Sequence, residues 1–285
     1  MTVSKSHHFV PQLLLKNFTD ANGRLWCCRK GMASVTDRVP REVYFRNHFH
    51  TEIGPDGTKD TSLEDEFSRL ESASGPVIQK FLENARLGKY PRLSSEERSV
   101  WDRFLYAQWK RTPLSVAQRY IDTEFEKNRD IAVRSIKEEF RELKPEEEKW
   151  LADSDVQKRV KQSVRVDSLR RYPDYIRRFI AELGVGIGVL EKPSKAFVIG
   201  SSPVVRIVTA ESQMLGSPGV GLYLPIASDV VVCTLAKGQS SGIATITKDS
   251  WVRDFNLLQY NQSDEIASRS EKLTRSICGI RSKKG

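Results

Sequence analysis

The sequence is poor in cysteine and has no long apolar run. Its four cysteines, at positions 27, 28, 233 and 278, form no CxxC pair, which argues against a structural zinc site, and they suggest no disulfide framework. The first eight residues, MTVSKSHH, lack the apolar core of a secretory signal. No stretch approaches the roughly 18 apolar residues of a membrane span. We therefore expect a cytoplasmic protein with no membrane partner.

Two nucleotide-binding motifs are also absent. No GxxxxGK[ST] phosphate loop occurs in the chain. The segment GVGIG at 184–188 lacks the GxGxxG spacing of dinucleotide-binding loops and leads into an expected strand rather than a helix. These absences argue against a P-loop nucleotidase and a dinucleotide-dependent enzyme.

The charge balance favours a polyanionic partner. The chain has 46 Lys and Arg residues against 37 Asp and Glu residues, a net charge of +9 and a pI of about 9.4. Such a positive field favours DNA or RNA as partner and leaves a protein partner open.

The residue pattern divides the chain into three stretches. Residues 1–60 combine an N-terminal helix with short strands, residues 61–183 are helical, and residues 184–285 carry an antiparallel β-sheet plus a C-terminal helix. We expect one integrated domain of the α+β class, in which a helical N-terminal and middle region packs with a C-terminal antiparallel β-sheet and the chain closes with a helix.

Several local elements can be predicted within these stretches. Strands are expected over 24–29 and 43–51, and a capping box at Ser94 and Glu97 starts a helix. The sequence KPSK at 192–195 is typical of a hairpin turn between two strands, and the last helical pattern covers about 250–276, in one piece or two.

Two adjacent histidines, His7 and His8, precede the first apolar run of the chain. They either help the backbone turn into the first helix, or one of them acts as a metal ligand or general base. A further pair, His48 and His50, alternates on the expected strand and would share one face. Such a lone HxH pair is a weak indication of metal binding.

Glu64 and Glu71 lie seven residues apart in an expected helix. They therefore lie two turns apart on one face, about 10 Å along the axis, beside the apolar stripe. In that position they can line a cleft and hold a divalent ion such as Mg²⁺ or Mn²⁺. The alternative is a solvated helix edge that forms ordinary salt bridges.

Gln108 and Arg111 are three residues apart and so point to the same side of their helix. Arg111 is suited to bidentate pairing with Glu71 or with a phosphate. A structural Arg–Glu bridge between two packed helices predicts the same neighbours, so both interpretations remain open.

The most basic stretch covers residues 158–178, with eight Lys or Arg and two Asp. Tyr172 and Tyr175 lie within it and are suited to stacking on bases. Because the spacing spreads the cations around a helix, part of the stretch is expected to be an ordinary solvated face. The candidate nucleic-acid-binding residues are Lys158, Arg159, Lys161, Arg165, Arg170, Arg171, Arg177 and Arg178.

Four short segments, in order along the chain, together resemble a bacterial and phage-associated family known as domain of unknown function 4238. They are HHFVPQ at 7–12 with Asn17 and Phe18, Leu63-Glu64 with Leu70-Glu71, QWKRTP at 108–113, and FVIGSSP at 197–203. The acidic residue usual in the last segment is Ser201 here. The resemblance implies no settled activity, and the phage association implies a defence or toxin effector.

Two functional hypotheses follow. The first is a metal-dependent nuclease or related phosphoryl-transfer enzyme, with His7 or His8 as base or ligand, the two glutamates as metal ligands and Arg111 neutralising phosphate charge. The second is a non-catalytic module that binds nucleic acid or protein, in which the same residues form a structural network. The serine at position 201 favours the second. Both predict that the histidines, glutamates, Gln108 and Arg111 converge in space.

Overall fold

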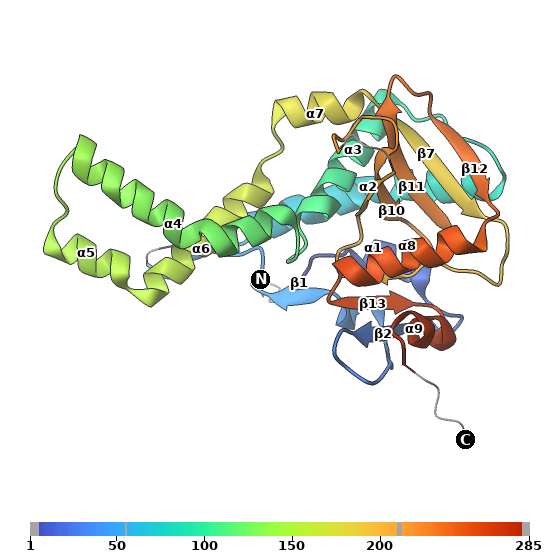
Figure 1. The fold of residues 1–285 in the computed structure, drawn as a ribbon, viewed down its shortest axis with the longest axis horizontal. Helices are drawn as coiled ribbons and strands as arrows, with labels where there is room; N and C mark the ends of the chain where they lie inside the picture. The colour runs from blue at the N-terminus through green and yellow to red at the C-terminus, as the bar shows by residue number, and fades with distance from the viewer. Residues whose placement is uncertain (1–5, 55, 210–212, 281–285) are drawn as a thin grey trace.

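The computed structural model describes residues 6–54, 56–209 and 213–280, which form an α+β fold (Figure 1). Its α-helices are α1 (Gln12–Leu15), α2 (Ser62–Arg86), α3 (Ser95–Lys110), α4 (Val116–Glu139), α5 (Pro145–Ala152), α6 (Ser154–Arg170), α7 (Asp174–Ala181), α8 (Asp249–Gln262) and α9 (Glu271–Ile277). Its strands are β1 (Ser6–His8), β2 (Leu25–Arg29), β3 (Thr36–Arg38), β4 (Phe45–Asn47), β5 (Glu52–Ile53), β6 (Lys59–Asp60), β7 (Leu183–Leu190), β8 (Ile199–Gly200), β9 (Val205–Val208), β10 (Val220–Pro225), β11 (Val230–Lys237), β12 (Gly242–Ile246) and β13 (Glu265–Ser268).

The larger sheet has five strands in the order β12-β7-β11-β10-β9. Its pairs are antiparallel except β12 with β7, which is parallel. The central strand β11 is buried along most of its length, and its run of Val residues is typical of a strand covered on both faces. The expected antiparallel sheet in the C-terminal third is therefore present, with one parallel edge pair.

A second sheet joins the two ends of the chain. Its order is β3-β2-β13-β8, and all three pairs are antiparallel. The predicted KPSK hairpin is wrong, because β7 belongs to the larger sheet and β8 pairs with β13 in this one. The helical pattern over 250–276 forms two helices, α8 and α9, and Glu265–Ser268 between them forms the strand that lies between β2 and β8. Pairing on both sides decides the conformation of this short segment.

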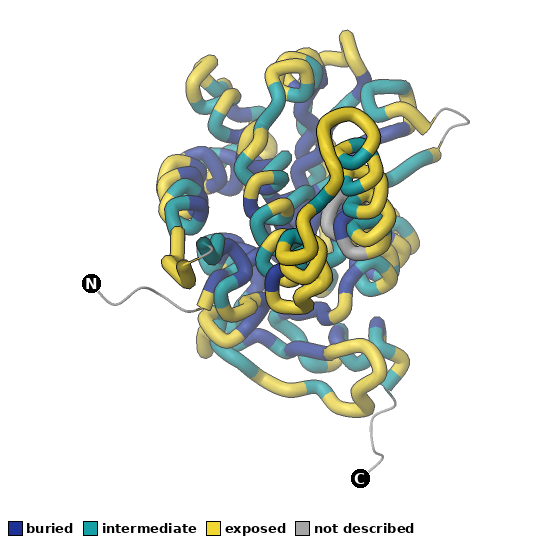
Figure 2. The backbone as a smooth tube through the Cα atoms, turned by 90° about the vertical axis from the view of Figure 1, so that its left-hand side faces the viewer, coloured by how far each residue is buried: buried dark blue, intermediate teal, exposed yellow. Residues whose placement is uncertain are grey.

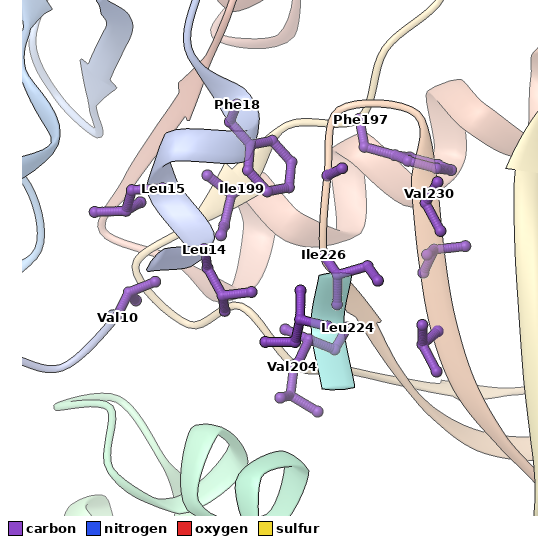
Figure 3. Packing of buried hydrophobic residues seen from close by; sticks show 14 of the residues in the cluster. Val10, Leu14, Leu15, Phe18, Phe197, Ile199, Val204, Leu224, Ile226 and Val230 are labelled. Carbon is purple, nitrogen blue, oxygen red and sulfur yellow. The ribbon is translucent and has the colours of Figure 1, made fainter. Parts of the chain in front are cut away.

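The main hydrophobic core lies between the N-terminal helix and the strands (Figure 3). Leu14, Leu15 and Phe18 are fully buried there against Ile199 and Ile226. Asn17 fixes the helix in place, because its side-chain amide donates to the carbonyl of Ile226 and its own carbonyl accepts from Ser228.

Helices α2 and α3 pack against each other, and α2 also contacts β7 of the larger sheet. The capping box is confirmed: Ser94 accepts from the backbone amide of Glu97, and the Glu97 carboxylate accepts from the backbone amide of Ser94. Helix α8 lies over β8, β9 and β13 (Figure 1). No helix in the described part of the chain is long and apolar enough to span a bilayer.

Helices α4, α5 and α6 (residues 116–170) extend away from the rest of the molecule, and we call them the helical arm (Figure 1). Figure 2 looks onto this side of the molecule and shows many exposed residues along it. Helix α6 returns from the tip of the arm, packs against α4 and then contacts β5.

One expectation about cysteine is corrected. A disulfide joins Cys28 of β2 to Cys278, which directly follows α9. The two residues are 250 positions apart, and only the packing of α9 on β2 and β13 brings them together. Spacing along the chain could therefore not reveal this pair.

Candidate metal centre

His7, His50 and Glu64 meet at the base of the helical arm. Their potential ligand atoms all lie within 4.8 Å of one another. Nδ1 of His50 is 2.5 Å from Oε2 of Glu64, and Nδ1 of His7 is 3.7 Å from the same oxygen. Both imidazoles are fully buried, whereas the Glu64 side chain is 25 % exposed. The group is therefore closed on the histidine side and open to solvent on the carboxylate side.

Each of the three residues reaches the centre from a different element. His7 lies on β1 opposite Arg46 of β4, which places it beside the turn that carries His50. Glu64 lies in the first turn of α2, where a negative carboxylate interacts favourably with the positive end of the helix dipole. The backbone amide of His50 donates to Nδ1 of His7 at 3.0 Å, so the two histidines are joined directly.

The turn that presents His50 contains an unusual backbone. His48 adopts a φ of 55°, a left-handed conformation that costs a non-glycine residue about 1 kcal/mol, and the amide of Thr51 donates to its carbonyl. The expected strand over 43–51 is thus limited to β4. Gln162 of α6 holds the turn from outside, because its amide nitrogen contacts the carbonyls of His48, Phe49 and Thr51 at 3.0–3.3 Å.

The environment keeps His50 neutral and Glu64 ionised. Burial lowers the pKa of His50 to about 4, and the hydrogen bond with Glu64 offsets this only in part. Burial alone would raise the pKa of Glu64. The hydrogen bond from His50 and the positive charge of Arg111 oppose this effect, and the net result is a lowered pKa. A neutral His50 therefore donates from Nδ1 to Glu64 and presents the lone pair of Nε2.

His8 does not join this group, although its sequence neighbour does. Successive side chains of a strand point to opposite faces, and both histidines lie on β1 rather than at the start of the first helix, where we expected them. Nε2 of His8 lies 3.2 Å from the carbonyl of Arg41. Burial lowers the pKa of His8, and the charges of Glu71 and Arg111 also act on it, so His8 borders the site.

Arg111 connects the second and third sequence motifs to the first. Its Nη1 is 2.8 Å from Oε1 of Glu71, and its Nε donates to the carbonyl of Phe9 at 2.8 Å. The guanidinium also lies over the ring of Phe67. The side chain is only 1 % exposed, so the two central helices and the N-terminal strand meet at this residue.

Several buried polar atoms around these residues lack a partner among the residues that the structure describes. They are Nε2 of His50, Nη2 of Arg111 and both amide atoms of Gln108, which lies on α3 three residues before Arg111. A buried polar atom without a hydrogen bond costs about 1–3 kcal/mol. Their grouping indicates a place where water or a ligand completes the site.

Ser201 lies outside this centre. Its hydroxyl accepts from the backbone amides of Asp264 and Glu265, and it lines a separate cavity of about 290 Å³ with Arg29 and Arg38. The neighbouring Ser202 contacts Thr112 through their hydroxyls at 3.4 Å. The fourth motif thus adjoins the third without contributing to the histidine group.

Most cations of the basic stretch are engaged within the chain. Lys158, Arg171 and Arg177 pair with aspartates in their own helices. Arg170 pairs with Asp60 and Glu66 at the base of α2. The other three cations of α6 also have partners: Lys161 and Arg165 lie over aromatic rings, and Arg159 interacts elsewhere in the chain.

Arg165 lies beside the turn that carries His50. Its guanidinium lies 5.7 Å from the ring centroid of Phe49, the residue before His50. Arg178, in contrast, lies on α7 and is exposed. The basic stretch therefore combines internal pairs with a few residues that face solvent.

The ligand set suits a transition metal better than magnesium. Two imidazoles and one carboxylate are typical ligands of Zn²⁺, Mn²⁺ or Fe²⁺, whereas Mg²⁺ prefers oxygen. We expected Glu64 and Glu71 to act together, but Glu64 lies with His7 and His50, and Glu71 lies with Arg111. The only sequence signal for His50 was its alternation with His48.

The comparisons with known proteins agree with the sequence motifs. No curated protein and no protein of solved structure matches the chain significantly. The model of a family described as proteins of unknown function, DUF4238, matches residues 6–272, which include the histidine group and Arg111. The chain therefore belongs to the DUF4238 family.

Proposed function

We propose that this protein is a metal-dependent phosphodiesterase, and specifically a nuclease. The observation that carries the proposal is the meeting of His7, His50 and Glu64 within 4.8 Å, near the buried guanidinium of Arg111. A metal-ligand set beside a fixed positive charge is the arrangement that phosphoryl transfer requires. The net charge of +9 supports an anionic polymer as substrate.

The protein side of this chemistry can be assigned residue by residue. His7, His50 and Glu64 would hold a divalent ion such as Mn²⁺ or Zn²⁺, which when bound supplies an activated water and a Lewis acid. The Glu64 carboxylate accepts from Nδ1 of His50 in this structure, and both atoms would be free to face the ion once that proton is lost. Arg111 and Gln108 are buried beside the centre, so the guanidinium would stabilise phosphate charge through its electric field rather than by direct contact. His8, with its lowered pKa, is neutral at pH 7 and can accept a proton.

Solvent reaches the centre on the side of its carboxylates. Among the site residues, the side chains of Glu64 and Glu71 are 25 % and 26 % exposed, while His7, His50 and Arg111 are at most 1 % exposed. A scissile phosphate must therefore approach along the exposed edge of α2. We propose a defence or toxin effector role for this activity, by analogy with the phage association that the sequence resemblance implies.

A cleavage assay tests the proposal. Purified protein is incubated with labelled single- and double-stranded DNA and RNA, with Mg²⁺, Mn²⁺, Zn²⁺ or EDTA. We expect cleavage with a transition metal and none with EDTA. Glu64→Gln should abolish it, whereas Asp65→Asn, which removes the exposed neighbouring carboxylate, should leave it intact.

The absence of cleavage under every metal condition would refute the nuclease proposal. The non-catalytic alternative would then be favoured if the unmodified protein still bound one of these nucleic acids with an affinity that falls steeply with salt.

A further inference from the structure

The helical arm exposes an unusual amount of apolar surface. Among the described residues, eight of the thirteen large apolar side chains that are exposed lie on the arm, the loop after α4 or the start of α7. They are Tyr120, Ile131, Ile136, Phe140, Trp150, Val160, Val164 and Tyr175. Single exposed apolar residues are ordinary, but a concentration on one projecting element marks an interaction surface.

This surface is hollowed into a continuous groove between α4 and α6. A cavity of about 380 Å³ near the tip is lined by Phe125, Ile136 and Leu151. A second cavity of about 640 Å³ lies at the base, beside Trp109 and Tyr175. Tyr120, Ile121 and Val164 line both cavities, so the two form one groove along the arm.

The arm buries little apolar surface of its own. Within the arm, the described apolar side chains that are buried are Ile121, Val156, Val166 and Leu169. Val166 and Leu169 pack on α2 at the base rather than within the arm. Most of the stability of a helix in a protein comes from packing of its apolar face, so a partner that covers the groove would stabilise the arm.

Charge at the two ends of the groove indicates which partner fits. The tip, residues 137–149, carries six carboxylates and four cations. The base, residues 165–178, carries five arginines and two aspartates. Glu142 and Glu146 at the tip and Arg178 at the base have no ion-pair partner among the described residues. The acidic tip and the basic base are therefore complementary to each other.

We propose that the groove is covered by the arm of a second copy of this chain. A two-fold axis across the arms makes them antiparallel and places the acidic tip of each arm over the basic base of the other. Equivalent surfaces then cover each other, and four helices pack in the manner of a bundle. This proposal rests on the arm alone and is independent of the metal centre.

The mass of the full chain in solution tests the dimer. Light scattering or sedimentation should give twice 32.5 kDa at micromolar concentration. Ile136→Glu and Val164→Glu place a charge in the groove and should each shift the dissociation constant at least tenfold toward monomer. Leu258→Glu alters an exposed leucine on α8 and should leave the dimer unchanged. Circular dichroism of the Ile136→Glu variant should show that its helices remain folded.

Charge reversal tests the antiparallel arrangement. Glu142→Lys with Glu146→Lys should weaken the dimer, and so should Arg177→Glu with Arg178→Glu. The chain that carries all four changes should recover dimerisation, because tip and base are again opposite in sign. A monomer at every concentration, a dimer indifferent to Ile136→Glu and Val164→Glu, or no recovery in the fourfold variant would each overturn the proposal.

Discussion

Nδ1 of His50 lies 2.5 Å from Oε2 of Glu64, and the two residues come from a turn and a helix that are 14 positions apart. This contact fixes the tautomer of His50, because Nδ1 donates to the carboxylate and Nε2 keeps its lone pair. The proton shared by the two residues must leave before Nδ1 and the carboxylate can bind one ion, so metal binding should compete with this hydrogen bond. The contact also links β1 to α2, since the backbone amide of His50 donates a hydrogen bond to His7.

The Gln162 side chain should couple the helical arm to the centre. Gln162→Leu removes the donor to three backbone carbonyls of the turn, and we expect a loss of about 1–3 kcal/mol in the free energy of unfolding. Metal affinity should fall as well, because the turn carries His50. Urea denaturation and calorimetric titration with Mn²⁺ or Zn²⁺ measure both. Ser163→Ala is the matched control on the same helix, and equal behaviour of the two variants would contradict the coupling.

Arg111 should be irreplaceable even by lysine. Arg111→Lys loses the fixed geometry that reaches both Glu71 and the carbonyl of Phe9. Because lysine keeps the charge but cannot reach both buried partners, we expect a loss of about 1–3 kcal/mol in the free energy of unfolding. Arg69→Lys, an exposed change on α2, serves as control. Thermal and chemical unfolding of the two variants measure the difference, and a stability of Arg111→Lys within 1 kcal/mol of the parent would argue against a central role of this contact.

Stability should depend on pH through Asp102. Burial raises the pKa of Asp102 to about 6, although Arg98 donates a hydrogen bond to the carboxylate and acts to lower it. In the unfolded chain the pKa of this carboxyl is near its ordinary value. Protonated Asp102 therefore adds to the free energy of unfolding at low pH, and this contribution is lost as pH rises through 6. Between pH 4.5 and pH 7 this amounts to about 2 kcal/mol.

The variant Asp102→Asn isolates this dependence, since asparagine does not titrate. The unfolding free energy of the parent relative to Asp102→Asn should fall by about 2 kcal/mol between pH 4.5 and pH 7. Urea titrations at both pH values measure it. A difference that stays constant or rises with pH would contradict the burial of a carboxyl with a raised pKa.

The N-terminal helix should contribute strongly to stability despite its four residues. Leu14 is fully buried between the helix and the strands, so Leu14→Ala should cost roughly 2–5 kcal/mol. Leu87 is 70 % exposed, and Leu87→Ala should change stability by less than about 0.5 kcal/mol. Chemical denaturation compares the two variants, and similar losses for both would contradict the assigned core.

Local patterns in the sequence were sufficient for many elements. The capping residues Ser94 and Glu97 predicted the start of α3, and the spacing of Glu64 and Glu71 placed both on one face of α2. The α+β class followed from the change from helical to β-branched patterns. These features depend on neighbours within a few residues, which is why they can be predicted from sequence.

Features that depend on distant contacts could not be predicted in the same way. His50 was expected on a strand, but the left-handed backbone of His48, where glycine or asparagine would be usual, ends the strand before it. Strand β13 and the disulfide between Cys28 and Cys278 exist only because segments more than 200 residues apart pack together. Gln162 gave no signal, since its partners are backbone carbonyls.

Metal binding by the purified, chelator-treated protein is the most direct test of the proposed centre. Calorimetric titration with Zn²⁺ and Mn²⁺ should give one site per chain. That site should be lost in His50→Ala and Glu64→Gln and retained in Asp65→Asn. Binding that persists in His50→Ala and Glu64→Gln, or no binding of either ion by the parent, would contradict a metal centre at His7, His50 and Glu64.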